Sequence, residues 1–178
     1  MQKKIPIRYL PFRYMQKKIP IRYLPFRLTR KDKKKQIQML EKSKKLYKKG
    51  EYYTRKNLKS YKNKPSQHVA RARKIYGVET IRPNEKLAIA TGCSLDALKK
   101  IVKKGEGAYF SSGSRPNQTA QSWGLARLAS SITSGKSASI DYDIIQEGCN
   151  HKKKAFILAN KSRKKWNLGR SHTKRRIV

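Results

Sequence analysis

The sequence predicts a mainly α-helical protein: a small helical module with a helix-turn-helix-like pair, flanked by long basic arms that are extended or helical. Apolar residues recur at helical spacing in several segments, and residues that cap or end helices separate these segments. Hydrophobic residues make up only 37% of the 178. We therefore expect a small core rather than a large one.

The charge is spread unevenly along the chain. The sequence has 46 Lys and Arg against 10 Asp and Glu, a formal charge of +36. The span 81–150 holds nine basic and six acidic residues, so the remainder carries 37 basic and four acidic residues. This division predicts a central compact module at 81–150 between a Pro-rich arm at 1–28, a basic helical or linker region at 29–80, and a basic helix and tail at 151–178.

The first 28 residues contain a tandem repeat. The segment Met1–Arg13 recurs unchanged at Met15–Arg27, and four prolines in the two copies exclude helix and favour extended backbone. Alternate side chains of an extended chain share one side, which predicts an arm that docks in the grooves of a partner. The residues expected to dock are Ile5, Ile7, Tyr9, Ile19, Ile21 and Tyr23. The alternative is a recent duplication, or a natural start at Met15.

A helix is expected to begin at Thr29. Thr29 followed by Asp32 resembles a capping box, and Ile37, Leu40 and Tyr47 form a weak apolar stripe. Tyrosines then alternate with cations, a pattern typical of binding to single-stranded or structured nucleic acid, because rings stack on bases while cations contact phosphates. The tyrosines are Tyr52, Tyr53 and Tyr61. The alternative is a solvated basic linker whose tyrosines pack locally.

A short basic helix is expected from Ser66 to Tyr76, ended by Gly77. Between Asn84 and Ile101 the spacing matches a helix-turn-helix, with Gly92 in the turn. Ser94 is expected to cap the second helix and Gly105 to end it. The residues after Ser94 are poor base readers, so we expect the helix pair without sequence-specific readout of DNA.

The span 105–119 is predicted to be a small-residue loop, in which backbone amides and Arg115 could bind an anion. A helix capped by Thr119 is expected over 120–132, and a short one over 140–147, closed by Gly148. The sequence Ser134–Ser137 resembles the end of a phosphate loop, but it lacks the first glycine and the preceding strand.

The sequence does not predict an enzyme, a cofactor or a metal site. The three histidines are scattered, and two cysteines are too few for a disulfide scaffold. Cys149 and His151 are close enough to share a metal ion, and Asp141 with Asp143 could hold a divalent ion, but ordinary structural roles are expected for all four. No run of residues is apolar enough to span a membrane, and the N-terminus lacks the apolar region of a secretory signal.

Basic residues in the arms and the module are expected to contact an acidic partner, nucleic acid first among them. These are Arg55, Lys56, Lys59, Lys62, Arg71, Arg73, Lys99, Lys100, Lys103, Lys104, Arg115, Arg127, Lys152, Lys153, Lys154, Arg175 and Arg176.

The run Gly107–Ser130, GAYFSSGSRPNQTAQSWGLARLAS, resembles a family of small basic proteins encoded by giant and algal viruses, the nucleocytoplasmic large DNA viruses. Ser134–Ser137, Asp141–Tyr142 and the N-terminal residues Arg22–Pro25, Leu28–Thr29 and Asp32–Gln36 resemble the same family. The resemblance covers about residues 22–178. It implies a viral source and assigns no catalytic residue.

On this basis we expect a non-enzymatic structural protein of the virion, of minor capsid or inner-core type. Its partners would be other capsid or virion proteins, double-stranded DNA, or both, and no small-molecule substrate is expected. It would be found in the virion, and in the host cytoplasm or nucleus during assembly. The alternatives are a nucleic-acid-binding protein that condenses or regulates viral DNA through the helix-turn-helix-like module, and a ribosomal-type RNA-binding protein.

Overall fold

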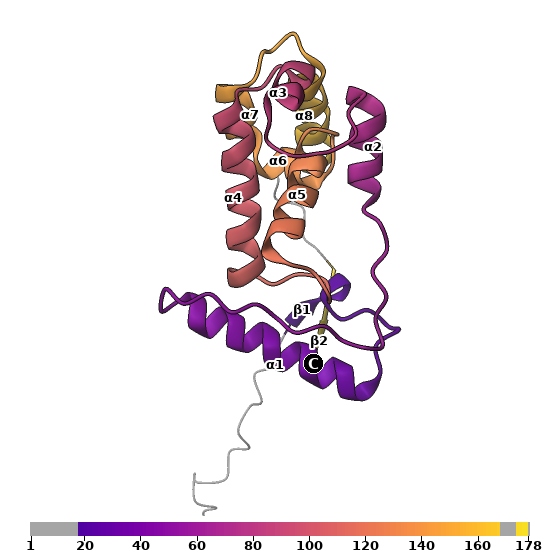
Figure 1. Ribbon diagram of the computed structural model, residues 1–178. Helices are drawn as coiled ribbons and strands as arrows, with labels where there is room; N and C mark the ends of the chain where they lie inside the picture. The colour runs from indigo at the N-terminus through magenta and orange to yellow at the C-terminus, as the bar shows by residue number, and fades with distance from the viewer. Residues whose placement is uncertain (1–17, 168–173, 178) are drawn as a thin grey trace, which may run out of the picture.

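The fold is built around two packed helices, α4 (Leu95–Ser111) and α5 (Ala120–Ser131), in a computed structural model that describes residues 18–167 and 174–177 (Figure 1). The mainly α-helical class expected from the sequence is confirmed. The other helices are α1 (Arg30–Tyr47), α2 (Gln67–Tyr76), α3 (Glu85–Thr91), α6 (Lys136–Ile140), α7 (Tyr142–Gly148) and α8 (Lys154–Lys165). None of the described helices is long and apolar enough to cross a membrane.

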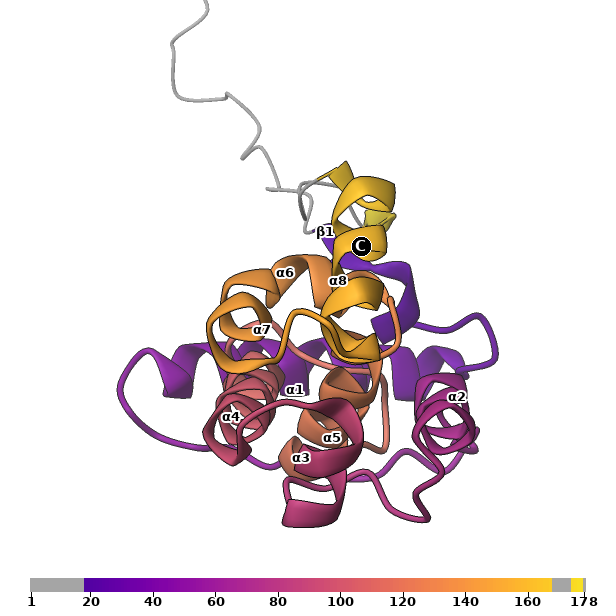
Figure 2. The ribbon, with the colours of Figure 1, turned by 90° about the horizontal axis from the view of Figure 1, so that it is seen from above.

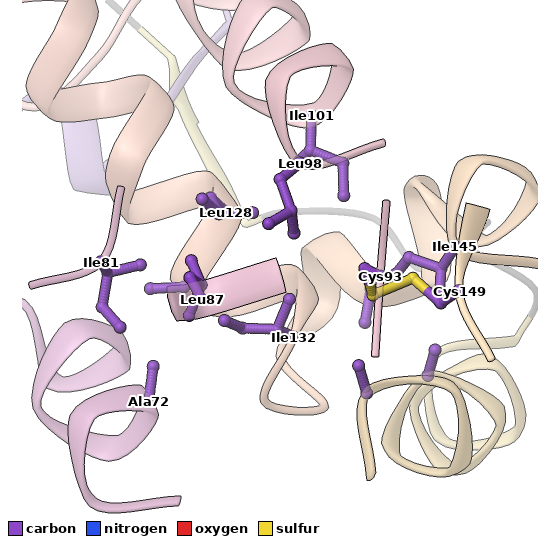
Figure 3. Packing of buried hydrophobic residues seen from close by; sticks show 14 of the residues in the cluster. Ala72, Ile81, Leu87, Cys93, Leu98, Ile101, Leu128, Ile132, Ile145 and Cys149 are labelled. Atoms are coloured by element: carbon purple, nitrogen blue, oxygen red, sulfur yellow. A yellow bond between two sulfur atoms is a disulfide. The ribbon is translucent and has the colours of Figure 1, made fainter. Parts of the chain in front are cut away.

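Viewed along the bundle, α5 lies near the middle, with α4 on one side and α2 on the other (Figure 2). α1 lies across the end of the bundle at which α4 finishes (Figure 1). The main core contains Leu98, Ile101, Leu128 and Ile132, all fully buried (Figure 3). Ala72 of α2 and two alanines of α8, Ala155 and Ala159, belong to the same core, which is therefore larger than the 81–150 module that we predicted.

Local capping chemistry explains where the helices begin and end. The hydroxyls of Thr29, Ser94 and Thr119 accept hydrogen bonds from the third backbone amide beyond them, as expected from the sequence. Gly77 and Gly92 follow α2 and α3 in the left-handed conformation, which ends both helices. Thr29 and Asp32 form only half of the predicted capping box, because the Asp32 carboxylate accepts hydrogen bonds from Ser60 instead.

The predicted end of the second helix at Gly105 is wrong, since α4 continues to Ser111. The predicted loop at 105–119 is consequently helical in its first half. Gly105 serves packing instead: a Cβ on Gly105 would lie 2.7 Å from the Cα of Gly124, and one on Gly124 would lie 2.8 Å from the carbonyl oxygen of Val102. The two glycines let α4 and α5 approach backbone to backbone.

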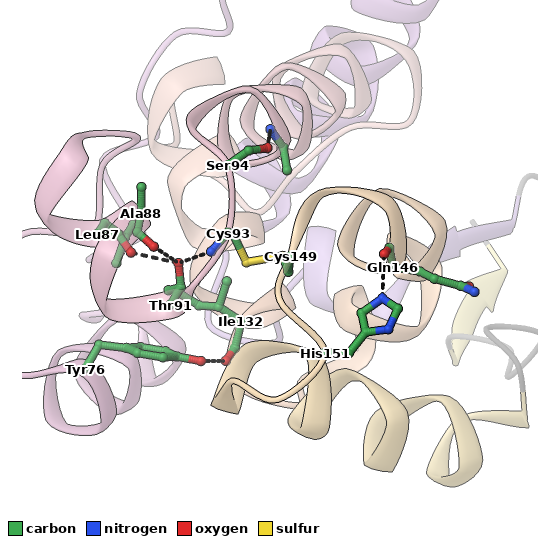
Figure 4. The surroundings of a disulfide bond; sticks show 11 residues. Tyr76, Leu87, Ala88, Thr91, Cys93, Ser94, Ile132, Gln146, Cys149 and His151 are labelled. Carbon is green, nitrogen blue, oxygen red and sulfur yellow. Dashed lines mark hydrogen bonds between the residues drawn. A yellow bond between two sulfur atoms is a disulfide. The ribbon is translucent and has the colours of Figure 1, made fainter.

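The short helix expected over 140–147 is present as α7, which begins at Tyr142, and an additional helix, α6, precedes it; Asp141 caps both. Cys93 and Cys149 form a disulfide that joins the turn before α4 to the residue after α7 (Figure 4). The two cysteines are also neighbours in an isolated β-bridge, and the amide of Ser94 donates to the carbonyl of Gly148 at 2.7 Å. The disulfide uses Cys149, so the shared metal site considered for Cys149 and His151 does not form.

The second copy of the N-terminal repeat packs on its own chain. β1 (Lys18–Pro20) pairs antiparallel with β2 (Arg175–Ile177), and the 3-10 helix η2 (Ile21–Tyr23) follows. Ile19 and Tyr23 are buried with Leu40 in a second core, and Ile21 is half-buried. The prediction that Ile19 and Tyr23 dock on a partner is therefore wrong. Ile5, Ile7 and Tyr9 of the first copy lie outside the described residues.

Gly105→Ala is expected to lower the free energy of unfolding by about 1–3 kcal/mol, because the new methyl group forces α4 and α5 apart. The matched control is Gly107→Ala on the same helix. Its Cβ would meet only the Tyr47 hydroxyl, at 3.4 Å, so better helix propensity should stabilise it by up to about 1 kcal/mol. Urea unfolding of the two variants measures both effects, and equal effects would contradict the close approach.

Removal of the disulfide is expected to destabilise the fold by up to about 4 kcal/mol, because it closes a loop with a sequence separation of 56. The comparison is urea unfolding of the wild type and of the Cys93→Ser/Cys149→Ser double variant, each with and without reductant. Reductant should destabilise the wild type alone. An unchanged wild-type midpoint would contradict a stabilising disulfide.

Candidate nucleic-acid interface

A large group of positive charges lies on α1, the irregular segment 48–66 and α2. Residues 30–77 contain 18 Lys and Arg and only three acidic residues, Asp32, Glu41 and Glu51. Sixteen of the 18 are exposed, Lys33 is half-buried and Arg55 is buried. Segment 48–66 runs back along α1 before it reaches α2, so these cations occupy one end and one side of the molecule (Figure 1). We call these 17 exposed and half-buried cations the basic face.

The buried stripe of α1 is narrow and largely polar. Asp32, Gln36, Leu40 and Ser43 recur at helical spacing and are buried, which leaves the lysines on the remaining surface of the helix. The Gln36 amide donates to the carbonyls of Tyr23 and Ser114, and the Ser43 hydroxyl donates to the carbonyl of Phe110. Hydrogen bonds as well as apolar contacts therefore hold α1 on the bundle.

Segment 48–66 is irregular, but hydrogen bonds anchor it on two sides. Asp32 accepts from the backbone amide and the hydroxyl of Ser60 at 3.0 and 2.6 Å, and these two bonds lower the pKa of the Asp32 carboxyl. On the other side, the Asn117 side chain accepts from the amide of Leu58 and donates to the carbonyls of Leu58 and Tyr61. Lys56, Lys59 and Lys62 are thereby held at defined positions and point to solvent.

Arg55 was expected to contact an acidic partner, and this prediction is wrong because the residue is buried. Its guanidinium donates to the Ser43 hydroxyl, the Tyr109 carbonyl and the Ser114 hydroxyl, at 3.2, 3.0 and 2.7 Å. The same group lies 3.7 Å from the centre of the Tyr109 ring. Loss of hydration lowers the pKa of Arg55, and the surrounding neutral acceptors replace the water.

Arg127 is also used within the fold. Its guanidinium donates twice to the buried carboxylate of Asp141, at 2.8 and 2.7 Å, and Ser131 and Lys104 bind the same carboxylate. Bidentate pairing commits both residues to each other. Asp141 is thus committed to Arg127 rather than to the divalent ion considered for it with Asp143, and a contact of Arg127 with a partner stays a prediction.

The remaining predicted cations are at the surface, but they do not form one patch. Lys56, Lys59, Lys62, Arg71 and Arg73 belong to the basic face. Lys152, Lys153 and Lys154 lie at the opposite end of α4, where the side chain of Lys153 packs against Gly92. The other predicted cations with exposed side chains are Lys99, Lys100, Lys103, Lys104, Arg115 and Arg175. Arg176 is half-buried, with its guanidinium 4.0 Å from the centre of the Phe26 ring.

Most cations of the basic face were not predicted from the sequence as partner contacts. Those on and just after α1 were not predicted as contacts. The sequence pattern of a helix with cations on all but one narrow stripe could have indicated them. They are Arg30, Lys31, Lys33, Lys34, Lys35, Lys42, Lys44, Lys45, Lys48 and Lys49. Near the start of α1, Lys31, Lys35 and Lys59 line a shallow hollow, together with Asn57 and the Asp32–Ser60 pair.

The three predicted aromatic contacts have different surroundings. Tyr52 is 72% exposed, whereas Tyr53 and Tyr61 are half-buried. The ammonium of Lys42 lies 4.7 Å from the centre of the Tyr53 ring. Tyr52 is therefore the only one of the three with a largely free face.

The helix-turn-helix-like pair is present as α3 and α4, but the start of α4 faces its own chain. A Cβ on Gly148 of α7 would lie 2.4 Å from the Cβ of Ala97. Ser94 is tied to the same residue by its amide, and Asp96 and Glu147 place acidic groups in the hollow between α4 and α7. α7 thus packs against the end of α4 that reads bases in DNA-binding proteins, and Asp96 adds a negative charge there.

The histidines and acidic side chains of the described residues do not gather into a metal centre. No group of three or more His, Cys, Asp and Glu side chains among residues 18–167 and 174–177 is placed to hold a metal ion. His68 is half-buried, and burial followed by the charges of Arg71 and Arg115 lowers its pKa. His151 stacks on Phe156, and its ring nitrogen lies 2.9 Å from the Gln146 carbonyl oxygen. His172 lies outside the described residues.

The structure does not form a phosphate site at either of the two segments considered from the sequence, the span before α5 and Ser134–Ser137. Thr119 and Ser122 cap the start of α5 reciprocally, which occupies amides that an anion would need. Gly135 precedes α6, a helix of five residues, and its amide donates to the carbonyl of Ser130.

Most of the chain matches the model of a known sequence family. Residues 20–147 match DUF5824, described as a family of unknown function. The match covers more than half of the chain, and the protein therefore belongs to this family. No curated protein and no solved structure matches the chain. The family description names no source, so the resemblance to proteins of giant and algal viruses stays a prediction.

Arg55→Met is expected to lower the free energy of unfolding by about 3 kcal/mol, because Ser43, Ser114 and the Tyr109 carbonyl lose a charged hydrogen-bond donor. The matched control is Lys56→Met, the exposed neighbouring cation, for which we expect a change below about 0.5 kcal/mol. Both are measured by urea unfolding. A neutral Arg55→Met would contradict a structural role for the buried guanidinium.

Proposed function

We propose that the protein is a non-enzymatic nucleic-acid-binding structural protein, which holds the phosphate backbone with the basic face. The observation that carries the proposal is the arrangement of 17 exposed and half-buried cations on and around α1 with three acidic residues among them. So many like charges repel one another, and a bound polyanion offsets this electrostatic repulsion. Binding also releases the counterions of the polyanion, which favours the complex.

The setting that we propose is the particle of a large DNA virus, in keeping with the resemblance of Gly107–Ser130. There the protein would be an inner-core component that binds packaged double-stranded DNA. It would occur in virions, and in the host cytoplasm or nucleus during assembly. Bridging between capsid proteins, as a minor capsid component, is the alternative role within the particle. A count of copies in purified virions tests the setting, and absence from them would overturn it.

Two other roles are less favoured. A sequence-specific regulator would read bases with the start of α4, but α7 packs against this end and Asp96 lies on it. A ribosomal-type RNA-binding protein would also use the basic face, and comparison of duplex DNA with duplex RNA separates that role from ours. Binding to duplex RNA alone would favour the ribosomal role.

Binding to duplex DNA is expected to weaken log-linearly with salt and to be independent of sequence. The variant Lys31→Gln/Lys34→Gln/Lys35→Gln removes three cations from the basic face and should lower the steepness of the salt dependence by about 2–3 in the log–log slope. The measurement is fluorescence anisotropy of a labelled duplex across a salt series.

The matched control, Lys152→Gln/Lys154→Gln/Lys161→Gln, removes three exposed lysines on α8 and just before it. It has the same net charge, and we expect its slope to fall by less than about 1. Equal slopes for the two triple variants would contradict a localised basic face, and no binding by the wild type would overturn the proposed function.

A further inference from the structure

Three aromatic rings meet where α1 and α4 end. Tyr47 is the last residue of α1, Phe110 lies one residue before the end of α4, and Tyr52 lies on the segment between α1 and α2. The ring centres of Tyr52 and Phe110 are 5.0 Å apart, those of Tyr47 and Tyr52 are 6.0 Å apart, and those of Tyr47 and Phe110 are 6.2 Å apart. We call these three residues the aromatic cluster.

The cluster stands on a rigid base but is open above. Phe110 packs edge-on against Tyr109 at 4.9 Å, and Tyr109 is fully buried beneath the Arg55 guanidinium. The Tyr109 hydroxyl also accepts from the backbone amide of Arg55, which fixes the segment that leads from Tyr52. Tyr52 itself is 72% exposed, and Tyr47 and Phe110 are half-buried. A preformed aromatic surface is therefore left in contact with water.

Exposed lysines lie close to this surface along the chain. Lys44, Lys45, Lys48 and Lys49 flank Tyr47 in sequence and are exposed, and Glu51 is the single acidic residue between positions 42 and 78. On α4, Gly107 lies beside the Tyr47 hydroxyl, and Lys103 lies one helical turn before Gly107 with an exposed side chain. Positive charge thus reaches the cluster from both helices.

From this geometry we propose that the aromatic cluster binds single-stranded nucleic acid, with an unpaired base stacked on Tyr52 and the flanking lysines on the phosphates. An exposed ring beside cations is the arrangement with which proteins bind single strands without sequence preference. A duplex hides the faces of its bases, so the basic face alone would bind it. The inference rests on the proposed function and adds to it a preference for unpaired strands.

The test uses the full chain and two labelled ligands, an oligothymidine of about 12 nucleotides and a duplex of the same length. Tyr52→Ala is expected to weaken binding of the oligothymidine roughly 5- to 50-fold and to change binding of the duplex by less than about twofold. Tyr52→Trp keeps an aromatic face and should bind the oligothymidine within about twofold of the wild type. Circular dichroism verifies that both variants remain folded.

The matched control is Phe26→Ala, since Phe26 is 75% exposed and also lies beside a cation, Arg176, but away from the cluster. It should leave binding of the oligothymidine within about twofold. An equal loss for Phe26→Ala, or no loss for Tyr52→Ala, would overturn the inference. Polyglutamate serves as a probe for an acidic protein partner. If it competes for the site, and Tyr52→Ala weakens its binding as much as that of the oligothymidine, the inference is overturned in favour of such a partner.

These outcomes are separable from failure of the proposed function. If the wild type binds the duplex with steep salt dependence and Tyr52→Ala has no effect on either ligand, the inference fails and the proposed function stands. If the wild type binds neither ligand, the proposed function fails, and the inference fails with it.

Discussion

One buried cation holds together the elements that carry the basic face. Arg55 joins three parts of the chain: Ser43 of α1, Tyr109 of α4 and Ser114 of the loop before α5. Burial of a guanidinium costs several kcal/mol unless hydrogen bonds replace its water, and here three neutral acceptors and an aromatic ring do so. Because Arg55 lies in the middle of segment 48–66, its position fixes α1 against the bundle and turns the lysines on either side of it to solvent.

The same constraint links the two proposed binding surfaces. Tyr109 receives the Arg55 guanidinium on its face and the edge of Phe110 beside it, so the base of the aromatic cluster and the support of the basic face are one set of contacts. A loss of Arg55 would therefore loosen both surfaces together, whereas a loss of Tyr52 removes only an exposed ring. This difference is the reason that Tyr52, and not a residue beneath it, is the informative position for function.

Features that depend on a few neighbouring residues could be predicted from the sequence, and features that depend on distant partners could not. Thr29, Ser94 and Thr119 were predicted as caps because a hydroxyl and the amide three residues on are enough to define them. Gly105 was predicted to end a helix, yet its reason for being glycine is Gly124 on another helix, which no local pattern reveals. The Cys93–Cys149 disulfide and the burial of Arg55 are of the same kind, since each requires the tertiary fold.

The two ends of α4 have opposite characters, and this polarity favours one of the proposed ways of binding nucleic acid over the other. At its start, Asp96 is exposed beside Glu147, and α7 is tied to the turn by the disulfide and by the Ser94–Gly148 hydrogen bond. At its finish, Phe110 contributes to the aromatic cluster, and Lys103 adds charge one turn before Gly107. A helix that reads base edges in the major groove needs the first end free, whereas phosphate contact and base stacking need only the second. The helix-turn-helix-like pair thus acts as a packing unit, which presents the finish of α4 to the basic face.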